Sequence, residues 1–132
     1  MRVIGLDVGS KRIGVAVSDE LGILATPRGV IRRWSRNKDA AQIVHLVEET
    51  GAGAIVVGLP LGLSGSPTRQ TEKTEQFAAM LASRVPVPIH LWDERLTTVA
   101  AHELGPADRD DEIAAAIILQ EFLDSRRSRC PD

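Results

Sequence analysis

The sequence predicts an α/β fold in which helices cover both faces of a mixed five-stranded sheet. Three strand-like segments come first with no helix between them, and two more strands then alternate with helices. Strands joined by short turns form an antiparallel meander, whereas strands joined through helices run parallel. With 132 residues, the chain is long enough to bury one substantial core but not to form two lobes.

The first three strands are expected at residues 2–8, 12–18 and 23–32. A short Gly-Ser-Lys-Arg turn joins the first two, which predicts an antiparallel hairpin. Pro27 lies in the third strand. Because proline cannot donate a ladder hydrogen bond, this strand is expected to lie at a sheet edge or to contain a bulge.

A helix and a central strand follow the meander. Asn37 is the expected N-cap of the helix, apolar residues then recur at helical spacing, and Gly51 ends it. Residues 54–59 are continuously apolar, which is typical of a strand covered on both faces of the sheet. The next helix is expected to begin with Ser66 as its N-cap, followed by a proline, and to end near Ser83.

The last strand is expected at residues 87–92, and a short helix follows it. A final helix is expected to run from about Asp111 to about Asp124. Residues 1–125 are therefore expected to form one domain, and the Arg-rich residues 126–132 a flexible tail.

Composition excludes several classes of function. The net charge of −2 gives no overall basic surface, and with two tryptophans and two phenylalanines we do not expect rows of aromatic rings to hold a single strand. A lone cysteine excludes an internal disulfide. No apolar run approaches the roughly 18 residues of a membrane span, so we expect a cytoplasmic protein with no membrane partner.

Asp7 is the most informative residue, because it places a lone carboxylate inside an apolar strand. A charge is costly to bury unless it is paired or coordinates a metal. Gly9 and Gly14 leave room for backbone or ligand to approach closely. This combination indicates phosphate chemistry. The residues that supply donors and positive charge beside the carboxylate are Ser10, Lys11 and Arg12.

Two further acidic residues are candidates for the same site. Glu94 follows the last strand, where α/β sheets place ligand-binding residues, and Asp111 opens the final helix above three alanines. If this helix packs across the strand of Asp7, the three carboxylates converge. Such oxygen ligands suit Mg²⁺ or Mn²⁺, and two such ions can cleave a phosphodiester. Taken singly, Asp111 also fits an acidic helix start and Glu94 a surface ion pair.

Other polar residues are candidates for binding phosphate or nucleic acid. A Gly-Ser loop precedes a helix N-terminus, whose amides can hold an anion, and a cationic cluster covers residues 28–38. A threonine after the last strand is expected to cap a helix and to offer a hydroxyl. The candidates are Ser10, Lys11, Arg12, Ser64, Gly65, Arg95, Thr97, Arg32 and Arg33.

Four blocks of the sequence resemble the YqgF (RuvX) family. They appear in the family's order and span nearly the whole chain. The blocks are Gly5–Ala16, Val57–Leu61, Asp93–Thr98 and Asp111–Gln120.

The resemblance implies an RNase H-like fold, similar to that of the resolvase RuvC, and a metal-dependent nuclease. It places Asp7, Glu94 and Asp111 at the positions of the family's acidic residues. Members are implicated in maturing the 5′ end of 16S rRNA and are also described as Holliday junction resolvases. We therefore expect an rRNA precursor as substrate, with branched DNA, cut by a homodimer, as the alternative.

One departure from the family and two competing functions stay open. The segment 105–110, which is often longer and basic in the family, is short and acidic here, so the cationic cluster or a second subunit is expected to compensate. The hairpin also resembles the phosphate loop of actin-like ATPases and sugar kinases, but these need a second lobe. A non-catalytic nucleic-acid-binding protein is the other alternative.

Overall fold

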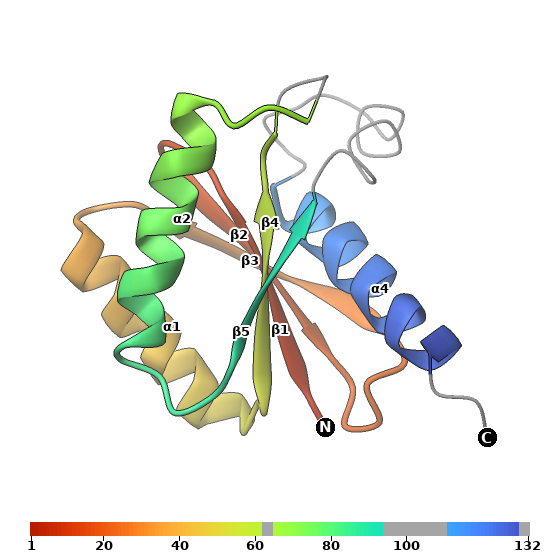
Figure 1. Cartoon of the computed structure of the whole chain (residues 1–132). Helices are drawn as coiled ribbons and strands as arrows, with labels where there is room; N and C mark the ends of the chain where they lie inside the picture. The colour runs from red at the N-terminus through yellow and green to blue at the C-terminus, as the bar shows by residue number, and fades with distance from the viewer. Residues whose placement is uncertain (62–64, 94–110, 130–132) are drawn as a thin grey trace.

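The computed structural model describes residues 1–61, 65–93 and 111–129 of the chain. It contains a five-stranded sheet with the order β3-β2-β1-β4-β5 (Figure 1). The first three strands are antiparallel, and the last two run parallel to β1. The predicted mixed sheet is confirmed. Its strands are β1 (Val3–Val8), β2 (Arg12–Ser18), β3 (Ala25–Arg32), β4 (Ala54–Leu59) and β5 (Ile89–Asp93).

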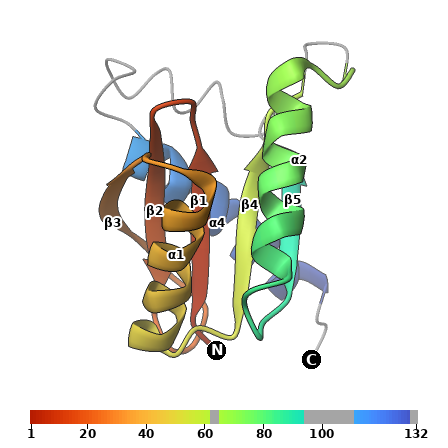
Figure 2. The same ribbon diagram turned by 90° about the vertical axis from the view of Figure 1, so that its left-hand side faces the viewer.

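Helices cover both faces of the sheet, as predicted. Figure 2 shows α1 (Arg36–Thr50) and α2 (Arg69–Ala82) in front of the strands and α4 (Asp111–Arg129) behind them. The predicted short helix after β5 lies outside the described residues. In the parts of the chain that the structure describes, no helix is long and apolar enough to cross a membrane. The cytoplasmic location stays a prediction.

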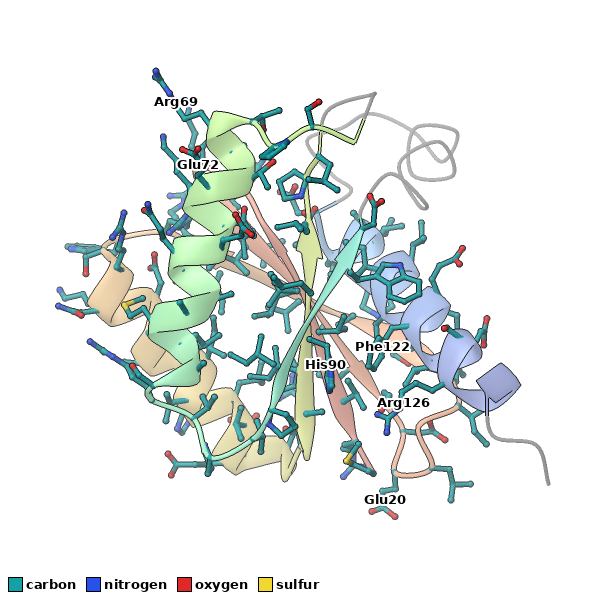
Figure 3. All side chains as sticks on the ribbon, in the orientation of Figure 1. Glu20, Arg69, Glu72, His90, Phe122 and Arg126 are labelled. Atoms are coloured by element: carbon teal, nitrogen blue, oxygen red, sulfur yellow. The ribbon has the colours of Figure 1, made fainter. Side chains whose placement is uncertain are left out.

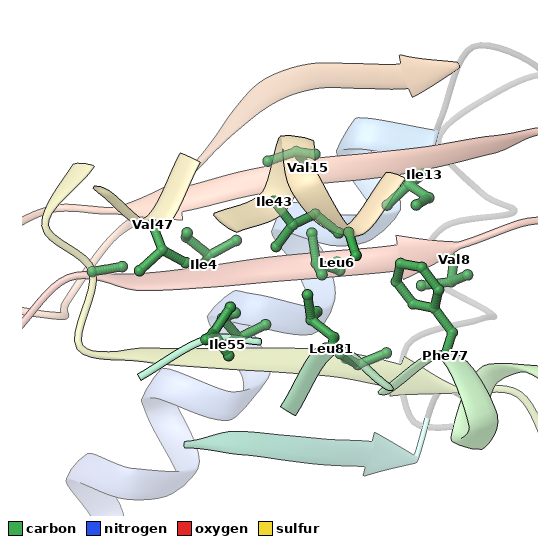
Figure 4. Packing of buried hydrophobic residues seen from close by; sticks show 14 residues of the cluster. Ile4, Leu6, Val8, Ile13, Val15, Ile43, Val47, Ile55, Phe77 and Leu81 are labelled. Carbon is green, nitrogen blue, oxygen red and sulfur yellow. The ribbon is translucent and has the colours of Figure 1, made fainter. Parts of the chain in front are cut away.

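The core has two layers because successive side chains of a strand point to opposite faces of the sheet. Ile4 and Leu6 of β1 pack against α1 and α2, in the layer that Figure 4 shows from close by. Val3 and Ala16 instead join the layer under α4, which is completed by apolar residues of that helix such as Leu119. The sheet is therefore buried on both faces at its centre.

Helix α4 lies unusually close to the sheet because glycines face it. A Cβ at Gly5 would lie 2.7 Å from Leu119 Cβ, and one at Gly14 would lie 1.9 Å from the carbonyl oxygen of Asp111. Ala115, one of the three alanines of the sequence argument, is fully buried there. The expected close approach of this helix is confirmed, and glycines of the sheet provide most of the room.

The first helix begins two residues earlier than predicted. Its N-cap is Ser35, whose hydroxyl accepts a 3.2 Å hydrogen bond from the amide of Lys38, so Asn37 already belongs to the helix. Both residue types cap helices well, and the extended backbone of Ser35 makes it the cap. Gly51 ends the helix in the left-handed conformation, as predicted.

The limits of four other elements also differ from prediction. The N-cap of α2 is Thr68, not Ser66, because Thr68 forms a reciprocal capping box with Thr71. Pro67 instead forms a bridge with Leu61. Helix α4 continues to Arg129, so the predicted tail is helical up to that residue. Strands β3 and β5 each begin two residues later than expected.

Strand β3 is an edge strand, as its proline predicted. Pro27 pairs with Ala16 of β2, and the register of the two strands shifts between Val15 and Ala16. Both expected signs of the proline, an edge position and an irregular register, are therefore present.

Candidate active site

Asp7 lies at the carboxyl end of β1 and faces helix α4. It is half-buried, and it follows Val3 and Gly5 on the face that contacts this helix. Its partner across the antiparallel ladder is Gly14 of β2. Directly paired residues lie about 4.5–5.5 Å apart, so whatever packs on Gly14 is a neighbour of Asp7.

Asp111, the first residue of α4, is what packs on Gly14. Its carbonyl oxygen occupies the space in which a Cβ of Gly14 would lie, at a distance of 1.9 Å. The structure therefore places two of the three predicted acidic residues, Asp7 and Asp111, next to the same glycine: Asp7 pairs with Gly14 in the sheet, and the backbone of Asp111 packs on its face. Glu94 lies outside the described residues, as do Ser64, Arg95 and Thr97.

The described end of β5 reaches the same edge of the sheet. Strands β1, β4 and β5 are parallel, with Leu6 paired to Val57 and Leu59 paired to Asp93. Because parallel strands end at the same edge, the carboxyl ends of β1 and β5 lie at this edge on either side of β4 (Figure 1). The chain continues from this edge to Glu94.

An ion pair joins the start of α4 to the hairpin turn. The Nε atom of Arg12 lies 2.8 Å from Oδ2 of Asp111. The side chains are 43% and 25% exposed, so water screens the pair only in part. Arg12, predicted as a phosphate contact, thus lies beside a predicted metal ligand and connects the acidic and cationic halves of the site.

Arg33 fixes the turn between β1 and β2 through hydrogen bonds to the backbone of the turn. Its Nη1 donates a 2.9 Å hydrogen bond to the carbonyl of Gly9, and its amide donates one of 2.9 Å to the carbonyl of Lys11. Its Nε donates at 3.1 Å to Asp39, a carboxylate that is 1% exposed, and its guanidinium lies over the ring of Phe77. Arg33 was predicted to contact nucleic acid, and the structure turns it toward the protein interior.

Sequence reasoning missed Asp39. It accepts hydrogen bonds from Arg33 and from the amide of Trp34, at 3.0 Å, and so fixes the segment between β3 and α1. In the sequence it resembles any acidic residue in the first turn of a helix. The available signal was the pair of arginines shortly before that helix, because a cation that turns inward needs a buried carboxylate as its partner.

Cationic side chains surround an open hollow of about 540 Å³ beside the turn. Arg32 of β3 and the residue after it line one part of the hollow, and the segment from the hairpin turn to the start of β2 lines the rest. We call it the cationic hollow; its lining residues are Ser10, Lys11, Arg12, Arg32 and Arg33. All five were predicted phosphate contacts, and the fold brings them to one place.

The start of α2 approaches the same end of β1. Gln70 donates a 3.3 Å hydrogen bond to the carbonyl of Val8, and the hydroxyl of Thr71 donates to the carbonyl of Pro60. Gly65, another predicted phosphate contact, lies three residues before the N-cap in the left-handed conformation. A positive φ of this kind favours glycine at this position.

Potential metal ligands within the described segments form no group of three or more. The two predicted ligands that both lie next to Gly14, Asp7 and Asp111, are acidic residues, whose carboxylates Mg²⁺ and Mn²⁺ prefer as ligands. The third predicted ligand, Glu94, belongs to the part of the chain outside that description.

Comparison with solved structures identifies the fold. The structure of Thermus thermophilus RuvC in complex with a Holliday junction substrate matches with a TM-score of 0.66 at 16% identity, covering 98% of both chains. A ROK hexokinase from Thermus thermophilus matches with a TM-score of 0.51 at 22% identity, covering 81% of this chain but 39% of the kinase. The chain therefore covers nearly the whole of the first structure but less than half of the second.

Sequence comparison identifies the family. A protein of Chloroflexus aurantiacus named "Putative pre-16S rRNA nuclease" is 44% identical, covering 96% of this chain and 88% of the relative. A protein of the same name from Symbiobacterium thermophilum is 42% identical, covering 100% and 98%. The family model RuvX, described as Holliday junction resolvase, matches residues 1–125. This chain therefore belongs to the RuvX family and has the fold of RuvC.

Proposed function

We propose that this chain is a metal-dependent nuclease that hydrolyses phosphodiester bonds at the site formed by Asp7 and Asp111. The observation that carries the proposal is the packing of the first residue of α4 onto Gly14, directly beside Asp7. It joins two carboxylates to a hollow lined with cationic side chains. Carboxylates suit a divalent cation, and a hollow lined with cationic side chains suits a phosphate substrate.

Asp7, Asp111 and Glu94 are the residues that would hold Mg²⁺ or Mn²⁺, as two ions. The donor set supports this assignment, because Asp7 and Asp111 offer carboxylate oxygens from two elements that meet at Gly14. When bound, such ions orient a water nucleophile and stabilise the leaving oxygen of a phosphodiester. Binding would also relieve the repulsion between neighbouring carboxylates and so stabilise the fold.

The cationic hollow would hold the phosphate backbone next to these carboxylates. Lys11 and Arg32 supply positive charge, and the planar guanidinium of arginine suits two hydrogen bonds to one phosphate. Arg12 spans from Asp111 to the hollow and would keep the scissile phosphate beside the acidic residues. Arg33 would support phosphate binding indirectly, by fixing the turn that carries the other residues.

The substrate we propose is the precursor of 16S rRNA. Relatives more than 40% identical over nearly the whole chain carry the corresponding name, which supports this choice. A four-way DNA junction is the second candidate, supported by the description of the matching family. Cleavage of a junction in paired strands calls for a twofold homodimer with two sites, whereas trimming of one RNA end does not. The dimer stays a prediction.

A side-by-side cleavage assay with Mg²⁺ or Mn²⁺ tests the proposal. It compares a 5′-extended 16S rRNA precursor with a synthetic four-way junction for the wild type, Asp7→Asn and Glu20→Gln. Glu20 is an exposed acid at the opposite end of the sheet from the start of α4 (Figure 3), so its variant controls for the loss of one negative charge. Thermal unfolding with and without Mn²⁺ accompanies the assay.

We expect Asp7→Asn to abolish cleavage, to keep its fold and to lose the stabilisation by Mn²⁺, while Glu20→Gln behaves like the wild type. Trimming of the RNA that disappears in Asp7→Asn supports the ribosomal role, and symmetric nicking of the junction that disappears supports the recombination role. If neither is cut but Mn²⁺ still binds, a non-catalytic nucleic-acid-binding protein replaces the nuclease. A variant that Mn²⁺ stabilises as much as the wild type would refute the metal assignment.

A further inference from the structure

Trp34 is a large aromatic residue that lies on the surface of the protein rather than in its core. Of the four Trp and Phe residues in the chain, Phe77 and Phe122 are buried and Trp92 packs against Phe122, whereas Trp34 is 79% exposed. Nζ of Lys38 lies over its ring, 4.5 Å from the ring centroid. A ring presented to solvent with a cation beside it is a surface that fits a flat, electron-rich partner.

The backbone of Trp34 is held firmly. Its amide donates a 3.0 Å hydrogen bond to the buried carboxylate of Asp39, which is itself fixed by Arg33. The next residue, Ser35, caps α1. Because its backbone is already ordered, the ring would lose little conformational freedom on binding a partner.

Trp34 and Arg32 lie on the same side of the chain. The amide of Arg33 continues the pairing of β3 with the hairpin by donating to Lys11, and Ser35 is also extended, so residues two apart point the same way. Arg33 points inward, which leaves Arg32 and Trp34 both exposed. Arg32 lines the cationic hollow proposed to hold phosphates, and Trp34 follows it two residues later on the same side of the chain.

We propose that Trp34 is a stacking platform for an unpaired base of the nucleic acid whose phosphates occupy the cationic hollow. This inference rests on the proposed function and refines it, because it favours substrates with a single-stranded segment at this position. Bases in an intact duplex have no exposed face to offer, whereas any unpaired base can stack on a ring. Lys38 would then neutralise the adjacent phosphate.

Binding measurements without cleavage test the stacking role. Fluorescence anisotropy in EDTA measures the affinity of the full-length chain for a labelled single-stranded RNA, a blunt duplex of the same sequence and a single strand with abasic positions. The variants are Trp34→Ala, Trp34→Phe and Arg32→Ala. Leu24→Ala is the matched control, because Leu24 is also a large apolar residue and is 63% exposed, but lies in the turn before β3.

We expect Trp34→Ala to weaken binding of the single strand by at least about fivefold, as the loss of one base–aromatic stack does. Trp34→Phe should recover most of the affinity, and Leu24→Ala should bind like the wild type. The salt dependence of binding should be unchanged in Trp34→Ala and smaller in Arg32→Ala, because stacking releases no counterions. The blunt duplex and the abasic strand should not distinguish Trp34→Ala from the wild type.

Two results would overturn the stacking role while leaving the nuclease proposal intact. One is unchanged affinity of Trp34→Ala for the single strand. The other is an equal loss with the abasic strand, which would indicate a contact with the backbone. If the wild type binds none of the three nucleic acids, the proposed function itself fails, and the exposed ring becomes a contact for another protein or a second copy.

Discussion

Gly14→Ala should move Asp111 away from Asp7 while leaving the strands paired. The added Cβ would lie 1.9 Å from the carbonyl oxygen of Asp111 and 2.2 Å from its carbonyl carbon, whereas ordinary contacts begin at 3.4 Å. The obstructing atoms belong to the backbone, so no side-chain rotation relieves the clash. The start of α4 must shift by about 1.5 Å, which is the difference between these distances.

The expected cost to stability is modest and the cost to activity is large. Overpacking costs about 1–3 kcal/mol, and alanine regains about 0.5–1 kcal/mol over glycine within a strand, so the net loss should not exceed about 2.5 kcal/mol. A misplacement of about 1 Å can lower the rate of cleavage about 100-fold. We therefore expect a folded protein with a loss of activity of at least that size and weaker stabilisation by Mn²⁺. Urea unfolding and the cleavage assay measure the two effects.

Gly5→Ala is the matched control. Its Cβ would clash with the same helix, at 2.7 Å from Leu119 Cβ, but two turns beyond Asp111. The required movement is smaller and lies away from the carboxylates, so we expect a loss of stability but cleavage within a few-fold of the wild type. Full activity in Gly14→Ala, or equal inactivity in Gly5→Ala, would refute the reasoning that this one contact positions Asp111.

Two further predictions concern charged residues that support the structure. Arg33→Ala leaves the carboxylate of Asp39 buried without its cation, and we expect a loss of about 3 kcal/mol in urea unfolding. A double variant that also replaces Asp39 should lose less than the sum of the single losses. Hydrogen bonds from two backbone amides of the β2–β3 turn, of Leu24 first and Ile23 second, lower the pKa of Asp19 from its ordinary value of 3.8. The resulting stability is present above pH 3.8 and is lost as the pH falls through the lower folded pKa, so Asp19→Asn should flatten the acid side of the stability–pH profile. An unchanged profile would contradict this account of Asp19.

The sheet could be predicted from the sequence because each strand carries its own pattern. The apolar runs, the turn between β1 and β2, and Pro27 of β3 are local signals, and the structure confirms what they indicated. Helix caps were less certain, because several capping residues stood near each start. Thr68 is the cap of α2 rather than Ser66 because Thr71 can return its hydrogen bond, and this reciprocity depends on geometry.

The acidic half of the site was predictable in part. Asp7 stood out because a charge interrupted an apolar strand, and the alanines after Asp111 indicated a close helix. That Asp111 packs on Gly14 was not predictable, because this contact joins residues nearly a hundred positions apart. The distant contact also explains why a glycine stands at position 14. The space left by the absent side chain was expected to admit a backbone or a ligand, and the backbone of α4 fills it.

In the cationic half of the site, neighbouring arginines that look alike in the sequence have different surroundings in the structure. In the sequence, Arg32 and Arg33 are equivalent, and both were expected to contact nucleic acid. Because the chain stays extended past β3, neighbours alternate between the two sides: Arg33 turns inward to Asp39, while Arg32 and Trp34 turn outward. The inward arginine then fixes the backbone from which the outward side chains project. The alternation of side chains, applied beyond the strand, therefore distinguishes Arg33, which fixes the backbone, from Arg32, which is exposed beside the cationic hollow.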